Sequence, residues 1–225
     1  ANADVRGVKA TISGAQDVAG NQSVSFATQT SVDFDTRNAD VVSVNATPNF
    51  LSDGASTLSV AITYSEAMDH GFDPEVTLNP ATVGGISTLV GSWSTDELGR
   101  SVYTVNYGVT DENVDVRNVK VNVSGAQDLA GNVQNALTGT TPVFSVDTQN
   151  PQVVTSSIND PLITDVDVGA GKLVVTYEFD EAMKTSVLPT VELDKSVSGV
   201  TLASRTWESD RILKATFNVS DANAD

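Results

Sequence analysis

The sequence predicts an all-β protein built from tandem β-sandwich repeats of about 110 residues. Three observations support this prediction: short stretches of alternating apolar and polar residues, turn-forming residues between them, and a second copy of the pattern about 111 residues later. Aromatic residues make up only 6% of the 225 residues. The frequent Val, Thr and Ser residues suit short strands better than helices.

Each predicted strand rests on period-two alternation, because successive residues of a strand point to opposite faces of a sheet. Residues 57–64, 103–109, 117–125 and 172–179 alternate in this way. The residues expected on the buried faces are Leu58, Val60, Ile62, Tyr64, Tyr103, Val105, Tyr107, Val109, Val119, Val121, Val123, Leu173, Val175, Tyr177 and Phe179. About seven such strands per repeat are typical of an immunoglobulin-like sandwich of two sheets.

The internal repeat sets the expected domain organisation. "SGAQDVAGN" (13–21) returns as "SGAQDLAGN" (124–132), "ITYSEAMD" (62–69) as "YEFDEAMK" (177–184), and "DPEVTL" (73–78) as "LPTVEL" (188–193). We place the junctions after Asp35 and Asp147, where "VDFDTRN" and "FSVDTQN" correspond. Residues 1–35 are then the C-terminal strands of a preceding repeat, 36–147 a complete repeat, and 148–225 the N-terminal strands of a following one.

Composition excludes several classes of function. The net charge of −17 disfavours binding to nucleic acid or to an anionic membrane, since phosphate binding needs clustered Lys and Arg. No cysteine is present, which excludes disulfides and thiolate metal sites, and no apolar run is long enough to cross a membrane. The single histidine, His70, has no equivalent in the second copy, so we expect no catalytic site and no enzyme.

The phrases "ITYSEAMD", "VSGAQDLAGN" and "FSVDTQNP" resemble those of bacterial Ig-like tandem repeats. Such repeats form the stalks of large secreted adhesins of the repeats-in-toxin and biofilm-associated types, and they also occur in S-layer proteins. The resemblance implies an extracellular structural protein at the bacterial cell surface, acting in cell adhesion, biofilm or a filament, with calcium between repeats. The partners we expect are neighbouring repeats of the same polypeptide or head-to-tail copies, and any surface glycan or receptor would bind domains outside this chain.

Calcium prefers carboxylate and amide oxygens, and such residues recur at equivalent positions of the two copies. The candidate ligands are Asp35, Asp147, Asp17, Asp128, Asn21, Asn132, Glu66, Glu181, Asp111 and Asp115. Other interpretations stay open for each of them. The "DxAGN" segments can be tight turns without metal, the glutamates can be solvated or paired with Lys, and "DENVD" (111–115) can be a charged loop.

Two alternative functions also stay open. Trp93 and Trp207, which match in the repeat, could bind a carbohydrate or a protein receptor, although packing within the sandwich explains their recurrence more simply. Alternatively, strands 1–35 of one copy could complete the unfinished sandwich 148–225 of another, giving a self-assembling fibre by strand complementation.

Overall fold

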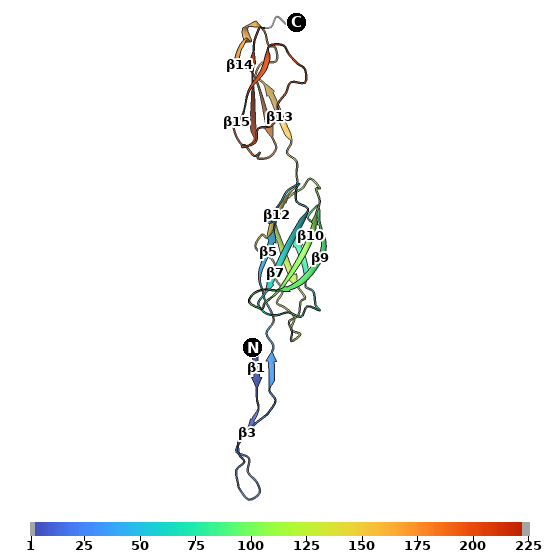
Figure 1. Ribbon diagram of the computed structural model, residues 1–225, viewed down its shortest axis with the longest axis vertical. Helices are drawn as coiled ribbons and strands as arrows, with labels where there is room; N and C mark the ends of the chain where they lie inside the picture. The colour runs from blue at the N-terminus through green and yellow to red at the C-terminus, as the bar shows by residue number, and fades with distance from the viewer. Residues whose placement is uncertain (1–2, 222–225) are drawn as a thin grey trace. The chain divides into compact units, whose positions relative to one another are not determined.

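The computed structural model describes residues 3–221, so residues 1–2 and 222–225, at the ends of the first and last predicted segments, lie outside it (Figure 1). The described chain is all-β, as predicted, with one short 3-10 turn, η1 (Asp165–Asp167). It divides into two compact units, Ala1–Gln149 and Asn150–Asp225. Within the described part, no helix has the length and apolarity needed to cross a membrane.

Two four-stranded sheets dominate the first unit, and their side chains share one core, consistent with a β-sandwich (Figure 1). One sheet has the order β5-β7-β10-β9, and the other has the order β6-β12-β11-β8. The bounds are β5 Val41–Thr47, β6 Phe50–Leu51, β7 Thr57–Tyr64, β8 Glu75–Asn79, β9 Ile86–Thr95, β10 Ser101–Val109, β11 Asp115–Ser124 and β12 Phe144–Asp147. All pairs are antiparallel except β6 with β12.

The core between these sheets follows the predicted alternation. Every second residue of β7 and of β10 is buried, and so are Val119, Val121 and Val123 of β11. Phe144 and Val146 of β12 fill the same core. The faces predicted from residues 57–64, 103–109 and 117–125 are therefore confirmed.

An N-terminal hairpin completes the first unit. β1 (Asp4–Val8) pairs with β4 (Val32–Asp35), and the shorter β2 (Thr11–Ile12) pairs with β3 (Phe26–Ala27). These strands form two-stranded sheets of their own, and most of their residues are exposed. The hairpin thus carries β-structure without a core of its own.

The second unit contains one four-stranded sheet of order β13-β14-β16-β15 (Figure 1, orange to red). The bounds are β13 Val153–Ile158, β14 Gly169–Phe179, β15 Val200–Trp207 and β16 Ile212–Val219. This order matches β5-β7-β10-β9 strand for strand. Residues 188–193, which correspond in sequence to the β8 region, form no strand. On β14 only Val175 of the four predicted inward residues is buried, whereas Leu173, Tyr177 and Phe179 are half-buried.

The shared core predicts a large cost for truncating Leu58, which is fully buried. Leu58→Ala should lower the free energy of unfolding of the first unit by about 2–5 kcal/mol, because it leaves a cavity between the sheets. Urea unfolding followed by Trp93 fluorescence in a Trp207→Phe background reports on this unit alone. The control Leu98→Ala, at a residue 77% exposed, should change it by less than about 0.5 kcal/mol. Equal effects of the two substitutions would contradict the assigned core.

Candidate metal centre

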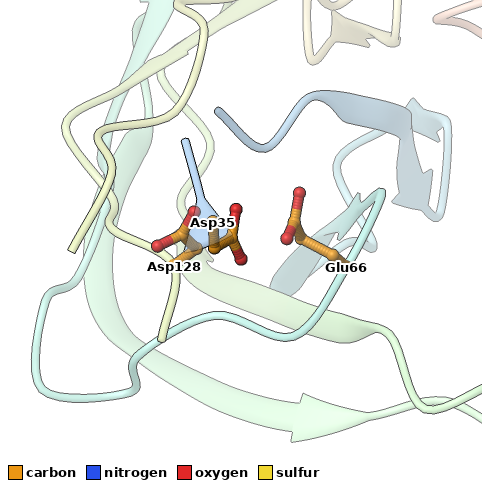
Figure 2. A group of neighbouring side chains, drawn as sticks. All are labelled: Asp35, Glu66 and Asp128. Atoms are coloured by element: carbon orange, nitrogen blue, oxygen red, sulfur yellow. The ribbon is translucent and has the colours of Figure 1, made fainter. Parts of the chain in front are cut away.

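Three carboxylates from distant parts of the chain converge at one end of the first unit's sandwich. Asp35 is the last residue of β4, Glu66 follows β7, and Asp128 lies in the loop after β11. One oxygen from each side chain lies within 4.8 Å of the others. Figure 2 shows Asp35 and Asp128 side by side, with the carboxylate of Glu66 facing them. All three belong to the set of candidate ligands predicted from the sequence.

A tight turn fixes the Asp128 carboxylate. Its Oδ1 accepts hydrogen bonds from the backbone N–H groups of Ala130 (2.8 Å) and Asn132 (2.9 Å), and its Oδ2 accepts one from Asn132 Nδ2 (2.9 Å). Gly131 has a φ of 88°, which residues with a Cβ rarely adopt, so the turn requires glycine there. The predicted turn chemistry is therefore present at Asp128, and it holds the carboxylate where a cation could bind.

The same loop fastens the segment that joins the hairpin to the sandwich. Asn132 Nδ2 also lies within hydrogen-bond distance of the backbone carbonyl oxygens of Asp35 (3.3 Å) and Arg37 (3.4 Å). Further along, Asn135 donates from its backbone N–H to the carbonyl of Ala39 (2.9 Å) and from its side chain to Asp40 (2.7 Å). These contacts place Asp35 beside Asp128 because they position the backbone on either side of it.

Burial and the neighbouring carboxylates both favour the protonated form of Glu66. Burial raises the pKa of this carboxyl above its ordinary value of 4.5, and the neighbouring Asp128 and Asp35 carboxylates raise it further. Arg37 acts in the opposite direction, but the net shift is upward. A bound cation would relieve this repulsion by favouring the ionised form of all three groups.

The donor set suits a hard divalent cation. Carboxylate oxygens are the ligands that Ca²⁺ prefers, and Ca²⁺ completes a shell of about six to eight oxygens with backbone carbonyls and water. In the described chain no cysteine is present, and His70 is not part of the cluster, so the cluster offers oxygen ligands only. Asp35, Glu66 and Asp128 would hold the ion.

The other predicted ligands, apart from Asn132, lie away from the cluster. Asp17 and Asn21 form the same turn as Asp128 and Asn132, with three hydrogen bonds of 2.9 Å, but they are exposed in the hairpin. Hydrogen bonds from Asn21 lower the pKa of Asp17. Glu181 is half-buried just after β14.

Two other predicted calcium ligands form ion pairs with Arg117. The distances from Arg117 to Asp115 and to Asp147 are both 2.9 Å, so the charge of these carboxylates is balanced by an arginine. Asp111 accepts a hydrogen bond of 2.8 Å from the backbone N–H of Asn113, as in a simple turn. Arg117 matches Arg6 in the repeat, and this recurrence is the signal in the sequence that could have identified it.

The tryptophans make contacts within the protein. Trp93 donates from Nε1 to Asp73 (2.8 Å), stacks on His70 with ring centroids 4.9 Å apart, and packs against Tyr64 and Tyr103. Its equivalent, Trp207, donates to the carbonyl of Val187 (2.8 Å). These contacts support the interpretation of both residues as packing elements.

Comparison with known proteins adds no relative: no protein-family model matches the chain, and no curated protein matches it significantly.

The raised pKa of Glu66 predicts a pH-dependent effect of Glu66→Gln in calcium-free buffer. The folded state binds the Glu66 proton more tightly than the unfolded state, so ionised Glu66 destabilises the fold at pH 7. Glu66→Gln should therefore be more stable than the wild type at pH 7. This difference should shrink as the pH falls towards 4.5, where the wild type becomes protonated. Urea unfolding between pH 7 and 5, followed by Trp93 fluorescence, measures it.

The exposed Glu97 supplies the control, because Glu97→Gln removes one negative charge from the same unit without touching the cluster. The difference between Glu97→Gln and the wild type gives the effect of removing one surface charge, against which the change for Glu66→Gln is compared. A difference for Glu66→Gln that does not change with pH would contradict the raised pKa of Glu66.

Proposed function

We propose that this chain is a structural extender segment of a bacterial cell-surface adhesin or extracellular filament, built from immunoglobulin-like repeats and stiffened by calcium at the junctions between them. The carboxylate cluster at Asp35 carries this proposal. Asp35 lies at the end of the hairpin, which we predict to belong to one repeat. Glu66 and Asp128 lie in two loops of the next repeat. In this proposal the chain is extracellular and has no catalytic role.

The position of the cluster explains why a metal would matter mechanically. Asp35 belongs to the strand that leaves the hairpin, whereas Glu66 and Asp128 belong to the sandwich. An ion bound by all three would tie the hairpin to the sandwich, in addition to the Asn132 and Asn135 hydrogen bonds. Flexing at this junction would then require breaking metal–oxygen bonds, and a chain of such junctions would resist bending.

The charge of the whole chain fits the same role. A net charge of −17 attracts cations and repels anionic polymers, so divalent ions at the junctions would offset part of the self-repulsion. The internal repeat supports an extender rather than a specific binding module, because repetition adds length without adding new chemistry. Trp93 and Trp207 make contacts within the protein itself, which argues against their use as a carbohydrate-binding surface.

Calcium binding is the measurable consequence. In chelator-treated protein, added calcium should raise the free energy of unfolding of the first unit, by about 2.7 kcal/mol at free calcium 100-fold above Kd. Asp35→Asn should abolish the effect, because it removes one charge from the cluster but preserves the size of the side chain. Isothermal titration calorimetry and thermal unfolding, with magnesium in parallel, measure it.

Glu97→Gln serves again as the charge-matched control and should bind calcium like the wild type. A chain that neither binds calcium nor gains stability from it would exclude the metal-stiffened junction. Calcium binding that survives Asp35→Asn would place the metal elsewhere.

A further inference from the structure

Three turns of the described chain share one five-residue pattern, and the sequence repeat accounts for only two of them. The pattern is an aspartate, two further residues, a glycine, and a fifth residue whose side chain can donate a hydrogen bond. The turns occupy residues 17–21, 128–132 and 96–100. The third turn has the sequence "DELGR" and joins β9 to β10, so it lies in the same unit as the carboxylate cluster.

The hydrogen bonds around the aspartate are the same in all three turns. The aspartate donates its N–H to the carbonyl of the fifth residue over 2.9–3.0 Å, and the glycine donates its N–H to the carbonyl of the aspartate over 3.0–3.1 Å. The aspartate Oδ1 accepts the N–H groups of the third and fifth residues over 2.8–3.0 Å. Because the turn at 17–21 is exposed and still has this geometry, its five residues determine it locally.

The turns differ at the fifth residue. Arg100 donates from Nε to Oδ2 of Asp96 (2.9 Å), and its Nη2 forms an ion pair with the same oxygen (2.7 Å). In the other two turns, an asparagine donates from Nδ2 to the equivalent oxygen, over 2.9 Å in both. The Oδ2 of this turn therefore does hold a cation where the chain supplies one. An amide at the same place keeps the hydrogen bond but leaves the charge of the aspartate unbalanced within the turn.

Burial makes this difference important at Asp128. Asp128 is 1% exposed, and oxygens of Asp35 and Glu66 lie within 4.8 Å of it. The Asn132 amide contacts both Oδ2 of Asp128 and the backbone carbonyl of Asp35, so it lies at the junction without adding any positive charge. A buried, unbalanced carboxylate costs more free energy than an exposed one such as Asp17.

We propose that Asn132 determines which kind of cation balances the Asp128 turn. Because the fifth residue is an asparagine, the turn takes a divalent ion from solution, whereas an arginine there would balance the turn from within the chain. This inference rests on the proposed calcium junction, and it names the residue that makes the junction depend on an ion. The turn at 96–100 is the example of the other case, since Arg100 balances it.

The shared geometry explains why an arginine would fit at position 132. The turn at 96–100 has the same backbone hydrogen bonds with an arginine as its fifth residue. A guanidinium has several N–H donors, so it can bind Asp128 Oδ2 and still donate to the carbonyl of Asp35 that Asn132 contacts. The substitution would thus exchange a metal ion for an internal ion pair, and the junction would no longer respond to calcium.

Stability in calcium-free buffer tests the charge balance without relying on metal binding. In chelator at pH 7, Asn132→Arg should raise the urea midpoint of the first unit, because it adds a positive charge beside three carboxylates. Trp93 fluorescence in the Trp207→Phe background follows this unit. The increase should be smaller when Asp35→Asn is also present, because one of the three charges is then absent.

Leu129→Arg is the matched control. It adds the same charge to the same turn, at a side chain that is 73% exposed. It should raise the midpoint by less than Asn132→Arg does. Equal shifts from the two substitutions, or a shift for Asn132→Arg that is unaffected by Asp35→Asn, would overturn the proposal.

Asn132→Asp changes the same position without changing its size. It adds a further carboxylate to the cluster and removes the Nδ2 donor, so it should lower the urea midpoint in chelator. Calcium should then raise the midpoint by more than it does in the wild type. A calcium-induced increase no larger than that of the wild type would reject the role of Asn132, even if Asn132→Arg does not fold.

Isothermal titration calorimetry with calcium separates this inference from the proposed function. Asn132→Arg should bind calcium at least about 10-fold more weakly than the wild type, because changing a group that hydrogen-bonds a metal ligand costs about 10–100-fold in affinity. Leu129→Arg should lose less. If the wild type and Asn132→Arg bind calcium equally well, this inference fails and the proposed function stands. If the wild type binds no calcium, both fail.

Discussion

The apolar face of a β-sheet has to be covered by other apolar side chains, and the core of each unit depends on which strands provide them. In the first unit, the alternating residues of β7 and β10 meet those of β11 and β12, and the result is a dry core. The second unit has the same inner strands but only a small core, centred on Val175, Ala215 and Phe217. The difference does not come from the strands themselves, because their order and alternation agree. Among residues 150–221 no strands correspond to β11 and β12, so this sheet packs against fewer apolar side chains.

Charge imposes the second constraint. The chain carries many more carboxylates than basic groups, so most acidic residues must lie in solvent, pair with one of the few cations, or share a bound ion. Arg117 illustrates pairing, since it serves both Asp115 and Asp147. The cluster around Asp128 is the place where we propose a shared ion, because Asp128 is 1% exposed beside two other carboxylates. Backbone N–H groups stabilise its charge but do not neutralise it.

The sequence predicted the buried faces of the inner strands and the local turns, but it did not predict which acidic side chains are buried. Alternation identified the inward residues of β7, β10 and β11, and the "DxAGN" phrase identified two turns that do have the same hydrogen bonds. Asp17 and Asp128 nevertheless differ completely in exposure, because the cover over Asp128 comes from segments far away in the sequence, such as the one around Met68. Asp35 and Asp147 illustrate the same limit. These two residues match in the repeat, but Asp35 belongs to the carboxylate cluster whereas Asp147 forms an ion pair with Arg117. The short motif around each aspartate does not show which of these partners it will have.

The proposed metal would act on the stiffness of the junction and would leave the fold unchanged. Asn132 and Asn135 already fasten the segment around Asp35 to the sandwich by hydrogen bonds. An ion bound by Asp35, Glu66 and Asp128 would add bonds between the hairpin and the sandwich, and its charge would offset the repulsion among the three carboxylates. Removing the ion should therefore loosen the junction without unfolding the sandwich, because the apolar core between the two sheets does not contain the cluster.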